Sequence, residues 1–244
     1  MAHSREIRSH ASEIKFVVTS EVSCLIRAWA RRHLDADPHG SGSFGDEYQT
    51  TSVYLDTADC DVFHRRGSFG RSKYRIRRYG HDGFAFLERK MRQPAVLAKR
   101  RTRVALDALD HLQRPTIEKE WSGRWFHRRL VARRLQPVCQ IAYSRTARVA
   151  LRDGDAIRLT LDSSLSAHAA CDLSFADGFA VPVLSGHAIL ELKYRGPAPA
   201  LFRRLVEEFA LNPQVASKYR LGLTALRIQD ALVASGSPGA VFHA

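Results

Sequence analysis

The sequence predicts an α+β protein built as an antiparallel eight-stranded β tunnel barrel with flanking helices. Eight segments alternate polar and apolar residues with a period of two, the pattern of a strand with one buried face. Only four segments show helical periodicity, and most connections are short, as in closed antiparallel sheets. A parallel α/β protein would alternate strands and helices throughout, and this chain does not.

The predicted elements follow one another along nearly the whole chain. The strands share the two-residue alternation and lie at residues 13–18, 50–55, 72–78, 84–92, 97–106, 138–149, 157–161 and 188–194. The helices share apolar residues at helical spacing and lie at residues 21–33, behind the cap candidate Ser20, and at 117–135, 199–210 and 221–233. No stretch resembles a long linker, so we expect one domain over residues 1–234 and a flexible C-terminal tail over residues 235–244.

The composition is that of a soluble globular protein, with 45% hydrophobic and 26% charged residues. No apolar run approaches the roughly 20 residues that a membrane helix needs, and the N-terminus has no signal-like apolar segment. The four cysteines lie far apart, which argues against a cysteine metal site or a disulfide framework. Together these features predict a cytoplasmic location.

The chain is strongly basic, with 38 Lys and Arg against 25 Asp and Glu and a net charge of +13. Such a charge favours a polyanionic partner: nucleic acid, an anionic membrane, or polyphosphate and nucleotides. Only seven of the basic residues are Lys, a compact and flexible point charge that suits phosphate oxygens. Six of the seven lie in predicted strands or in a short motif near the C-terminus.

The charged residues of the predicted strands gather on one face of each strand. Residues two apart share a face, so Lys73, Arg75 and Arg77 project together. The opposite faces are apolar, and a helix such as residues 199–210 needs an apolar face to pack on. We therefore expect the charged faces to turn inward to a shared lumen, where an anion would offset their mutual repulsion. The alternative is a half-exposed sheet whose charges face water.

A Glu-x-Lys pattern occurs three times on these faces, beginning at Glu13, Glu88 and Glu191. Each Lys would meet phosphate oxygens, and each Glu could hold a divalent cation, which prefers hard oxygen ligands and bridges phosphates. The alternative is that each pattern is a plain charge pair on a strand.

At these residues the sequence resembles the triphosphate tunnel metalloenzymes and, within them, the VTC domain of polyphosphate polymerases. The matching segments occur in the family's order over roughly residues 10–225. They are Glu13-Ile14-Lys15-Phe16, Tyr54-Leu55-Asp56-Thr57, Lys73-Tyr74-Arg75-Ile76-Arg77, Glu88-Arg89-Lys90, Tyr143-Ser144-Arg145-Thr146-Ala147, Arg158-Leu159-Thr160-Leu161-Asp162, Leu190-Glu191-Leu192-Lys193-Tyr194 and Ser217-Lys218-Tyr219.

The resemblance implies a tunnel that binds a triphosphate together with a divalent cation, Mn²⁺ or Mg²⁺. It implies Glu191 as the main metal ligand, with Glu13 beside it. Two positions depart from the family's pattern: Ala11 replaces the first Glu of the wider superfamily's first-strand motif, and Arg92 stands where the best-known polymerases have His. The resemblance implies eight phosphate-binding residues, and strand parity adds Lys73 and Lys99. The full expected set is Lys15, Lys73, Arg75, Arg77, Lys90, Lys99, Arg145, Arg158, Lys193 and Lys218.

The predicted function is metal-dependent phosphoryl transfer on triphosphate or polyphosphate, and specifically polyphosphate synthesis from a nucleoside triphosphate. The attacking group is an anionic phosphate oxygen, so no general base is needed, and the strand faces carry no Ser/His/Asp or Cys/His arrangement. The residues expected to act on the transferred group are Lys15, Arg75, Arg77, Lys90 and Lys193.

Three alternatives remain open at the level of sequence. The same tunnel could hydrolyse tripolyphosphate or a nucleoside triphosphate, or it could bind polyphosphate without turnover. The arginines of residues 121–135 could instead form a nucleic-acid-binding patch. We expect that segment to be a solvated basic face that gathers anionic substrate or contacts a membrane-anchored partner, and we expect no nucleic-acid partner.

Overall fold

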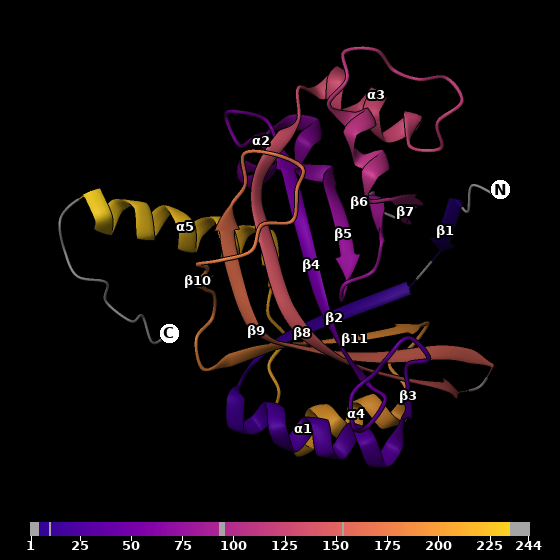
Figure 1. The fold of residues 1–244 in the computed structure, drawn as a ribbon. Helices are drawn as coiled ribbons and strands as arrows, with labels where there is room; N and C mark the ends of the chain where they lie inside the picture. The colour runs from indigo at the N-terminus through magenta and orange to yellow at the C-terminus, as the bar shows by residue number, and fades with distance from the viewer. Residues whose placement is uncertain (1–4, 10, 93–95, 153, 235–244) are drawn as a thin grey trace. The chain divides into compact units, whose positions relative to one another are not determined.

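The computed structural model describes residues 5–9, 11–92, 96–152 and 154–234 (Figure 1). The predicted tail, residues 235–244, lies outside the described residues. The chain divides into two compact units. Unit 1 comprises residues 1–9, 50–141 and 167–180, and unit 2 comprises residues 10–49, 142–166 and 181–244.

The described residues form eleven strands in one sheet, whose main path runs β1-β7-β6-β5-β4-β8-β9-β11-β2, with β3 on β8 and β10 on β9. The ladders that join β5, β6 and β7 and those that join β2, β9 and β11 are antiparallel. The strands are β1 Arg5–Ser9, β2 Ala11–Thr19, β3 Asp35–Ala36, β4 Glu47–Asp56, β5 Ser72–Tyr79, β6 Phe84–Arg92, β7 Val96–Ala105, β8 Gln136–Arg152, β9 Asp155–Ala169, β10 Val181–Pro182 and β11 His187–Arg195.

This topology confirms the predicted antiparallel α+β class and corrects the strand count. The path of paired strands among the described residues ends at β1 and β2, so the pairing itself does not close the sheet into a barrel. Two of the additional strands, β3 and β10, have only two residues each, too few for a two-residue alternation to be recognised.

Most of the helices connect strands, whereas α4 and α5 follow the last strand, β11. The α-helices are α1 Ser20–His33, α2 Asp61–His64, α3 Arg124–Arg133, α4 Ala200–Glu208 and α5 Lys218–Ala234, and the 3₁₀ helices are η1 Gly67–Arg71 and η2 Asp107–Leu112. No helix among the described residues is long and apolar enough to cross a membrane.

Two predicted helix starts are corrected. The N-cap of α1 is Thr19, not Ser20: the Thr19 hydroxyl accepts a hydrogen bond from the Val22 N–H at 3.3 Å, and Ser20 is already helical. The helix predicted at 117–135 begins only at Arg124. Before it the chain turns back at Gly123, so that the Trp121 ring lies over the glycine and stacks on His111 with 4.9 Å between ring centroids.

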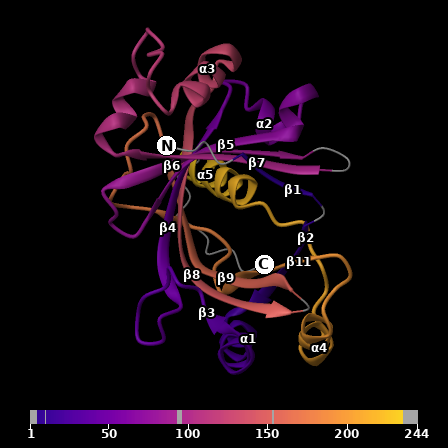
Figure 2. The ribbon, with the colours of Figure 1, turned by 90° about the vertical axis from the view of Figure 1, so that its right-hand side faces the viewer.

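In unit 2, α1 and α4 cover one face of the strands β2, β9 and β11 (Figure 2). The core between them is apolar and includes Phe16 of β2, Leu190 of β11, Trp29 of α1 and Phe202 of α4. Trp29 also donates its indole N–H to Glu208 at 3.0 Å, which ties α1 to α4. The charged residues of β2 and β11 therefore lie on the face that these helices leave uncovered.

In unit 1, α3 packs on β5 and β6 in the same way (Figure 2). The apolar face of the strands presents Tyr74, Ile76 and Leu87 to Phe126 and Leu130 of the helix. Each unit thus buries the apolar strand face beneath helices and leaves the charged face on the other side, as strand parity predicts.

The close approach of Trp121 to Gly123 makes a first prediction. A Cβ at position 123 would lie 2.4 Å from the Trp121 ring, so Gly123→Ala must push the ring off His111. We expect a loss of about 1–3 kcal/mol in the free energy of unfolding, measured by urea denaturation.

Gly83→Ala is the matched control, because a Cβ there would meet no atom within 4 Å and its backbone is not left-handed. Equal stability of both variants would show that Trp121 does not hold this turn.

Candidate functional site

The charged face of unit 1 is a grid of cations across β5, β6 and β7. Antiparallel register places Lys73 opposite Lys90, and Lys90 opposite Lys99, so three lysines form one cross-strand row. The next row places Glu88 between Arg75 and Arg101. Like charges directly opposite one another destabilise a sheet unless an anion lies between them. This face is therefore rich in closely spaced cations.

Glu88 is the centre of this grid, which we call the Glu88 cluster: Glu88, Arg75, Arg77, Lys99 and Arg101. Its carboxylate is only 2% exposed. Arg75 Nε donates to Oε2 at 2.6 Å, and Lys99 Nζ and Arg101 Nε lie 3.0 and 3.3 Å from Oε1. Three cations therefore share a single negative charge, which leaves the cluster with a surplus of positive charge.

The excess positive charge affects the pKa of Glu88 and that of the neighbouring Tyr79. Burial would raise the pKa of Glu88, but Arg75, Arg77, Lys99 and Arg101 outweigh it and hold that pKa well below its usual value. For the neighbouring Tyr79, burial again acts to raise the pKa, and the nearby arginines, Arg77 first, lower it to about 8. At both Glu88 and Tyr79, the cations of this face stabilise the negatively charged form.

In unit 2, the Glu191 cluster comprises Glu191, Glu13, Lys15 and Lys193. Lys15 lies directly opposite Glu191, and Glu13 opposite Lys193, on the paired strands β2 and β11. Lys193 Nζ is 2.5 Å from Glu191 Oε1, and Lys15 Nζ lies 3.1 Å from Glu13 and 3.7 Å from Glu191. Burial would raise the pKa of Glu191, whereas Lys193 and Lys15 hold it well below its usual value. Two lysines and two carboxylates thus lie next to one another across the paired strands β2 and β11.

A second group in unit 2, the Asp162 cluster, joins Asp162, Arg145, Lys218 and Tyr143. Arg145 forms a fork on the fully buried Asp162, with Nε and Nη2 donating at 2.6 and 2.8 Å to the two oxygens. Lys218 Nζ lies 2.5 Å from Oδ2 and 5.0 Å above the Tyr143 ring. Burial would raise the pKa of Asp162, but Arg145 and Lys218 lower it to about 2.

The remaining predicted phosphate ligands have protein partners. Arg158 Nη2 lies 2.8 Å from Asp37 and donates to Tyr48 at 2.9 Å. Arg77 donates to the Ser52 hydroxyl at 2.9 Å. Each unit therefore brings its own predicted cations together: Lys73, Arg75, Arg77, Lys90 and Lys99 in unit 1, and Lys15, Arg145, Arg158, Lys193 and Lys218 in unit 2.

Glu191 and Glu13 are the predicted metal ligands, and their donor chemistry suits a hard cation. No group of three or more His, Cys, Asp or Glu close enough to hold a metal occurs in the described part of the chain. Mg²⁺ commonly binds through one or two carboxylates, with substrate phosphates and waters as its other ligands. Lys15 already bridges the two carboxylates with a positive charge, so this pair is arranged around a cation.

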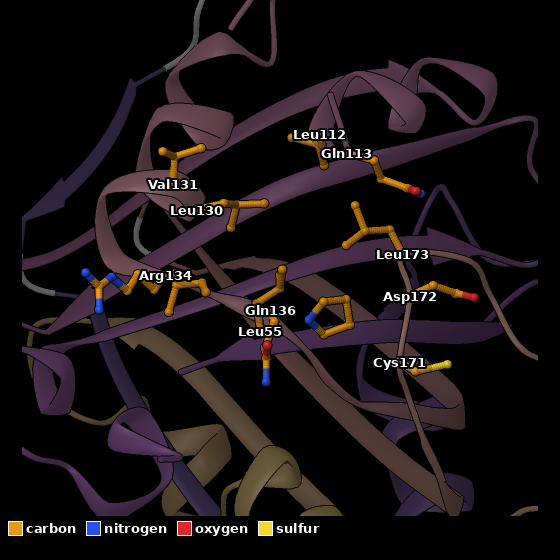
Figure 3. A pocket seen from close by; sticks show the side chains of 12 residues that line it. Leu55, Leu112, Gln113, Leu130, Val131, Arg134, Gln136, Cys171, Asp172 and Leu173 are labelled. Atoms are coloured by element: carbon orange, nitrogen blue, oxygen red, sulfur yellow. The ribbon is translucent and has the colours of Figure 1, made fainter. Parts of the chain in front are cut away.

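One hollow of unit 1 differs from this site in chemistry. It is a cavity of about 460 Å³ against α3, and its lining includes Leu55, Leu112, Leu130, Leu135 and Leu173, with Arg134 at one side (Figure 3). These leucines belong to the apolar core on the helix-covered face. The cavity is therefore no phosphate site.

Two partners of the site were missed as site residues in the sequence: Arg101 and Asp162. Arg101 shares strand parity with Lys99 and could have been found from it. Asp162 shares a face with Arg158, but its pairing with Arg145 and Lys218 joins β8, β9 and α5, which no local spacing reveals. The side chain of Arg92, noted as a departure from the family, lies outside what the structure describes.

Comparison with known families identifies the chain. The model of the VTC domain matches residues 10–227, so the chain belongs to the VTC domain family. This confirms the resemblance found in the sequence. Comparison with curated proteins gives no match.

Comparison with solved structures finds proteins similar to this chain. The chain is similar to an adenylate cyclase candidate from Bacillus halodurans, with 15% identity and a TM-score of 0.52 over 86% of this chain and 94% of that one. It also matches an adenylyl cyclase candidate from Hippeastrum with dominant triphosphatase activity, with 15% identity and a TM-score of 0.46 over 96% of this chain and 100% of that one. The first likeness supports the same fold.

The Asp162 cluster makes a prediction about acid stability. Because the folded pKa of Asp162, about 2, lies below the ordinary 3.8, its carboxylate stabilises the fold above about pH 4 and loses that effect as the pH falls towards 2. The lowered pKa corresponds to about 2 kcal/mol. We expect Asp162→Asn to lower the free energy of unfolding by about 3–5 kcal/mol at pH 6, since two buried cations lose their counterion.

The difference between wild type and Asp162→Asn should shrink as urea denaturation is repeated from pH 5 to pH 2. Asp155→Asn is the control, because its ion pair with Arg195 at 3.6 Å is about half exposed and contributes little. A difference of the same size at pH 6 and pH 2.5 would contradict this account of Asp162.

Proposed function

We propose that this protein is a metal-dependent phosphotransferase that acts on triphosphates and extends a polyphosphate chain from a nucleoside triphosphate. Membership of the VTC domain family supports a triphosphate substrate. The observation that carries the proposal is the row of three lysines, Lys73, Lys90 and Lys99, beside the Arg75–Glu88–Arg101 row. Such an array of cations matches a chain of phosphate groups, whose charge repeats at each phosphorus.

The reaction transfers one phosphoryl group between phosphate oxygens. A terminal oxygen of the polyphosphate attacks the γ-phosphorus, a new P–O bond forms, and the bond from that phosphorus to the β–γ bridging oxygen breaks. The nucleoside diphosphate leaves with the electron pair of that bond, so no proton has to be removed from the nucleophile. The charge on the transferred oxygens is what the protein must stabilise.

Within unit 1 we assign that stabilisation to Arg75, Arg77 and Lys90, and within unit 2 to Lys15 and Lys193. These side chains are held in place by their neighbours: Lys193 lies 2.5 Å from Glu191, and Arg75 2.6 Å from Glu88. Cations fixed before the substrate arrives need no reorganisation during transfer, which is the main source of electrostatic catalysis. Lys73, Lys99, Arg145, Arg158 and Lys218 would bind the rest of the phosphate chain.

Glu191 and Glu13 would hold the divalent cation. When bound, Mg²⁺ or Mn²⁺ supplies Lewis-acid neutralisation of phosphate oxygens. Within the chain, Lys15 and Lys193 keep Glu191 ionised, since they lower its pKa. A cytoplasmic location, a membrane-anchored partner and the absence of a nucleic-acid partner stay predictions from the sequence.

Product analysis tests this function directly. The purified protein is incubated with ATP and Mn²⁺, and the products are separated on a gel stained for polyphosphate. A ladder supports the polymerase. Phosphate released from ATP or tripolyphosphate without a ladder would show that the protein is a hydrolase. If neither polyphosphate nor free phosphate forms, the protein is a module that binds polyphosphate without turnover.

Glu191→Gln tests the metal ligand. The amide keeps the shape but loses the charge that a hard cation needs, so turnover should fall at least about a hundredfold, or roughly 3 kcal/mol in the barrier. Tripolyphosphate binding without metal should change little. Glu207→Gln, on the exposed side of α4, is the control and should keep full activity. Normal turnover in Glu191→Gln would remove Glu191 from the site.

Lys90→Arg and Lys193→Arg test whether a compact charge is needed. The guanidinium group of Arg is bulkier than the ammonium group of Lys and would displace a phosphate by about an ångström, which can cost on the order of a hundredfold in rate. We expect both variants to lose most turnover with nearly unchanged melting temperatures. Lys119→Arg, at an exposed position before α3, should lose none. Equal tolerance at all three positions would show that the choice of Lys over Arg has no functional meaning.

A further inference from the structure

The hollow beside α3 is a feature of unit 1 that the proposed function does not use. Four of the leucines that wall it come from separate segments: Leu55 at the end of β4, Leu112 of η2, Leu130 of α3, and Leu173, which follows β9. Each of these four side chains is at most 7% exposed, so the core of unit 1 holds the walls in place. The volume of about 460 Å³ lies in the range of about 300–1,000 Å³ that small-molecule sites occupy.

The apolar wall of the hollow continues to the protein surface at Val131 of α3. This side chain lines the hollow and is 56% exposed. Water in such a place finds few polar partners, so it is held weakly there. An apolar ligand would remove this surface from water, which favours binding.

One charged side chain of each sign lies at the rim of the hollow. Arg134 lies at one side, and Cys171 and Asp172 lie at the opposite side (Figure 3). The backbone of Arg134 is fixed at the end of α3, because its N–H donates to the Val131 carbonyl at 3.2 Å. Its guanidinium is exposed and forms no hydrogen bond or ion pair with another residue in the described part of the chain. The N–H donors of this group are therefore available to a ligand.

Asp172 determines which way round an anionic ligand would lie. Its Oδ1 accepts hydrogen bonds from the Ser174 N–H at 2.8 Å and from the Ser174 hydroxyl at 2.5 Å, and these bonds lower the pKa of Asp172. The ionised carboxylate would repel a negative group placed next to it. A ligand with one negative group would therefore place that group at Arg134 and direct its apolar part across the leucines towards Cys171.

We infer that this hollow binds a small apolar carboxylate, such as a medium-chain fatty acid, with its carboxylate at Arg134 and its hydrocarbon chain among the leucines. An arginine fork matches the two oxygens of a carboxylate. One arginine offsets one negative charge, whereas a phosphate monoester would bring almost two charges to the same rim as Asp172. The site goes beyond the proposed function, because it shares no residue with the phosphate-binding set.

Cys171 allows binding to be measured on the intact protein, because it lines the hollow and is exposed. The protein is treated with iodoacetamide in butanoate, hexanoate, octanoate or decanoate, or in chloride at equal ionic strength, and mass spectrometry follows the alkylation of each cysteine. At about ten times its Kd, decanoate should slow the alkylation of Cys171 about tenfold. Cys24, exposed on α1 in unit 2, is the internal control and should slow less than twofold.

The length of the carboxylate tests whether the hollow takes the hydrocarbon chain. Each additional buried methylene should tighten binding about fourfold, so the Kd of octanoate should be about sixteenfold below that of hexanoate. Equal protection of Cys171 and Cys24, protection that does not depend on chain length, or no protection would overturn the inference.

Arg134→Gln tests where the carboxylate lies. The replaced group is exposed and has no partner in the described part of the chain, so the melting temperature should not fall. The Kd of decanoate should rise about tenfold with the loss of the charged fork, whereas neutral decanol should bind the wild type and the variant alike.

Arg128→Gln is the matched control, because Arg128 is exposed on the same helix and does not line the hollow. It should change the Kd of decanoate less than twofold. Equal affinity of the wild type and Arg134→Gln for decanoate would also overturn the inference. No readout depends on turnover, so this site can fail while polyphosphate synthesis is confirmed, and it can stand if synthesis fails.

Discussion

Buried carboxylates that each hold more than one cation are the interaction on which both charged faces depend. Glu88 gathers Arg75, Lys99 and Arg101, and Asp162 gathers Arg145 and Lys218. The carboxylate offsets part of the desolvation and repulsion of its cations, and it fixes where they point. It does not neutralise them. The remaining positive charge is preorganised for an anion whose own charge is spread over many oxygens.

This arrangement depends on how the strands divide their two faces. Alternation puts Leu87 under α3 and Glu88 on the opposite side, and it puts Leu190 under α1 and α4 with Glu191 opposite. Each unit buries a core of large apolar side chains. The folding free energy gained by this burial offsets the cost of placing charged side chains close together on the other face. A one-residue slip in register would exchange the two faces, so the register that builds the core also builds the site.

Alternation is local, and for that reason the sequence predicted which residues share a strand face, as the ion pairs Glu13–Lys15 and Glu191–Lys193 show. It could not predict what long-range register decides: that three lysines meet in one row, or that Asp162 binds Arg145 and Lys218. The start of α3 was missed because helical periodicity in residues 117–123 is overridden by the packing of Trp121 on His111. The two-residue strands β3 and β10 carry no periodic signal at all.

In the proposed function, phosphate completes the positive charge that remains around the buried carboxylates. The most direct measurement is the melting temperature of the purified protein without metal, with tripolyphosphate added and with sodium chloride at the same ionic strength. A ligand that binds only the folded chain raises its stability by mass action, so tripolyphosphate should raise the melting temperature by several degrees at about a hundred times its Kd. An identical melting temperature in tripolyphosphate and in chloride would contradict the account.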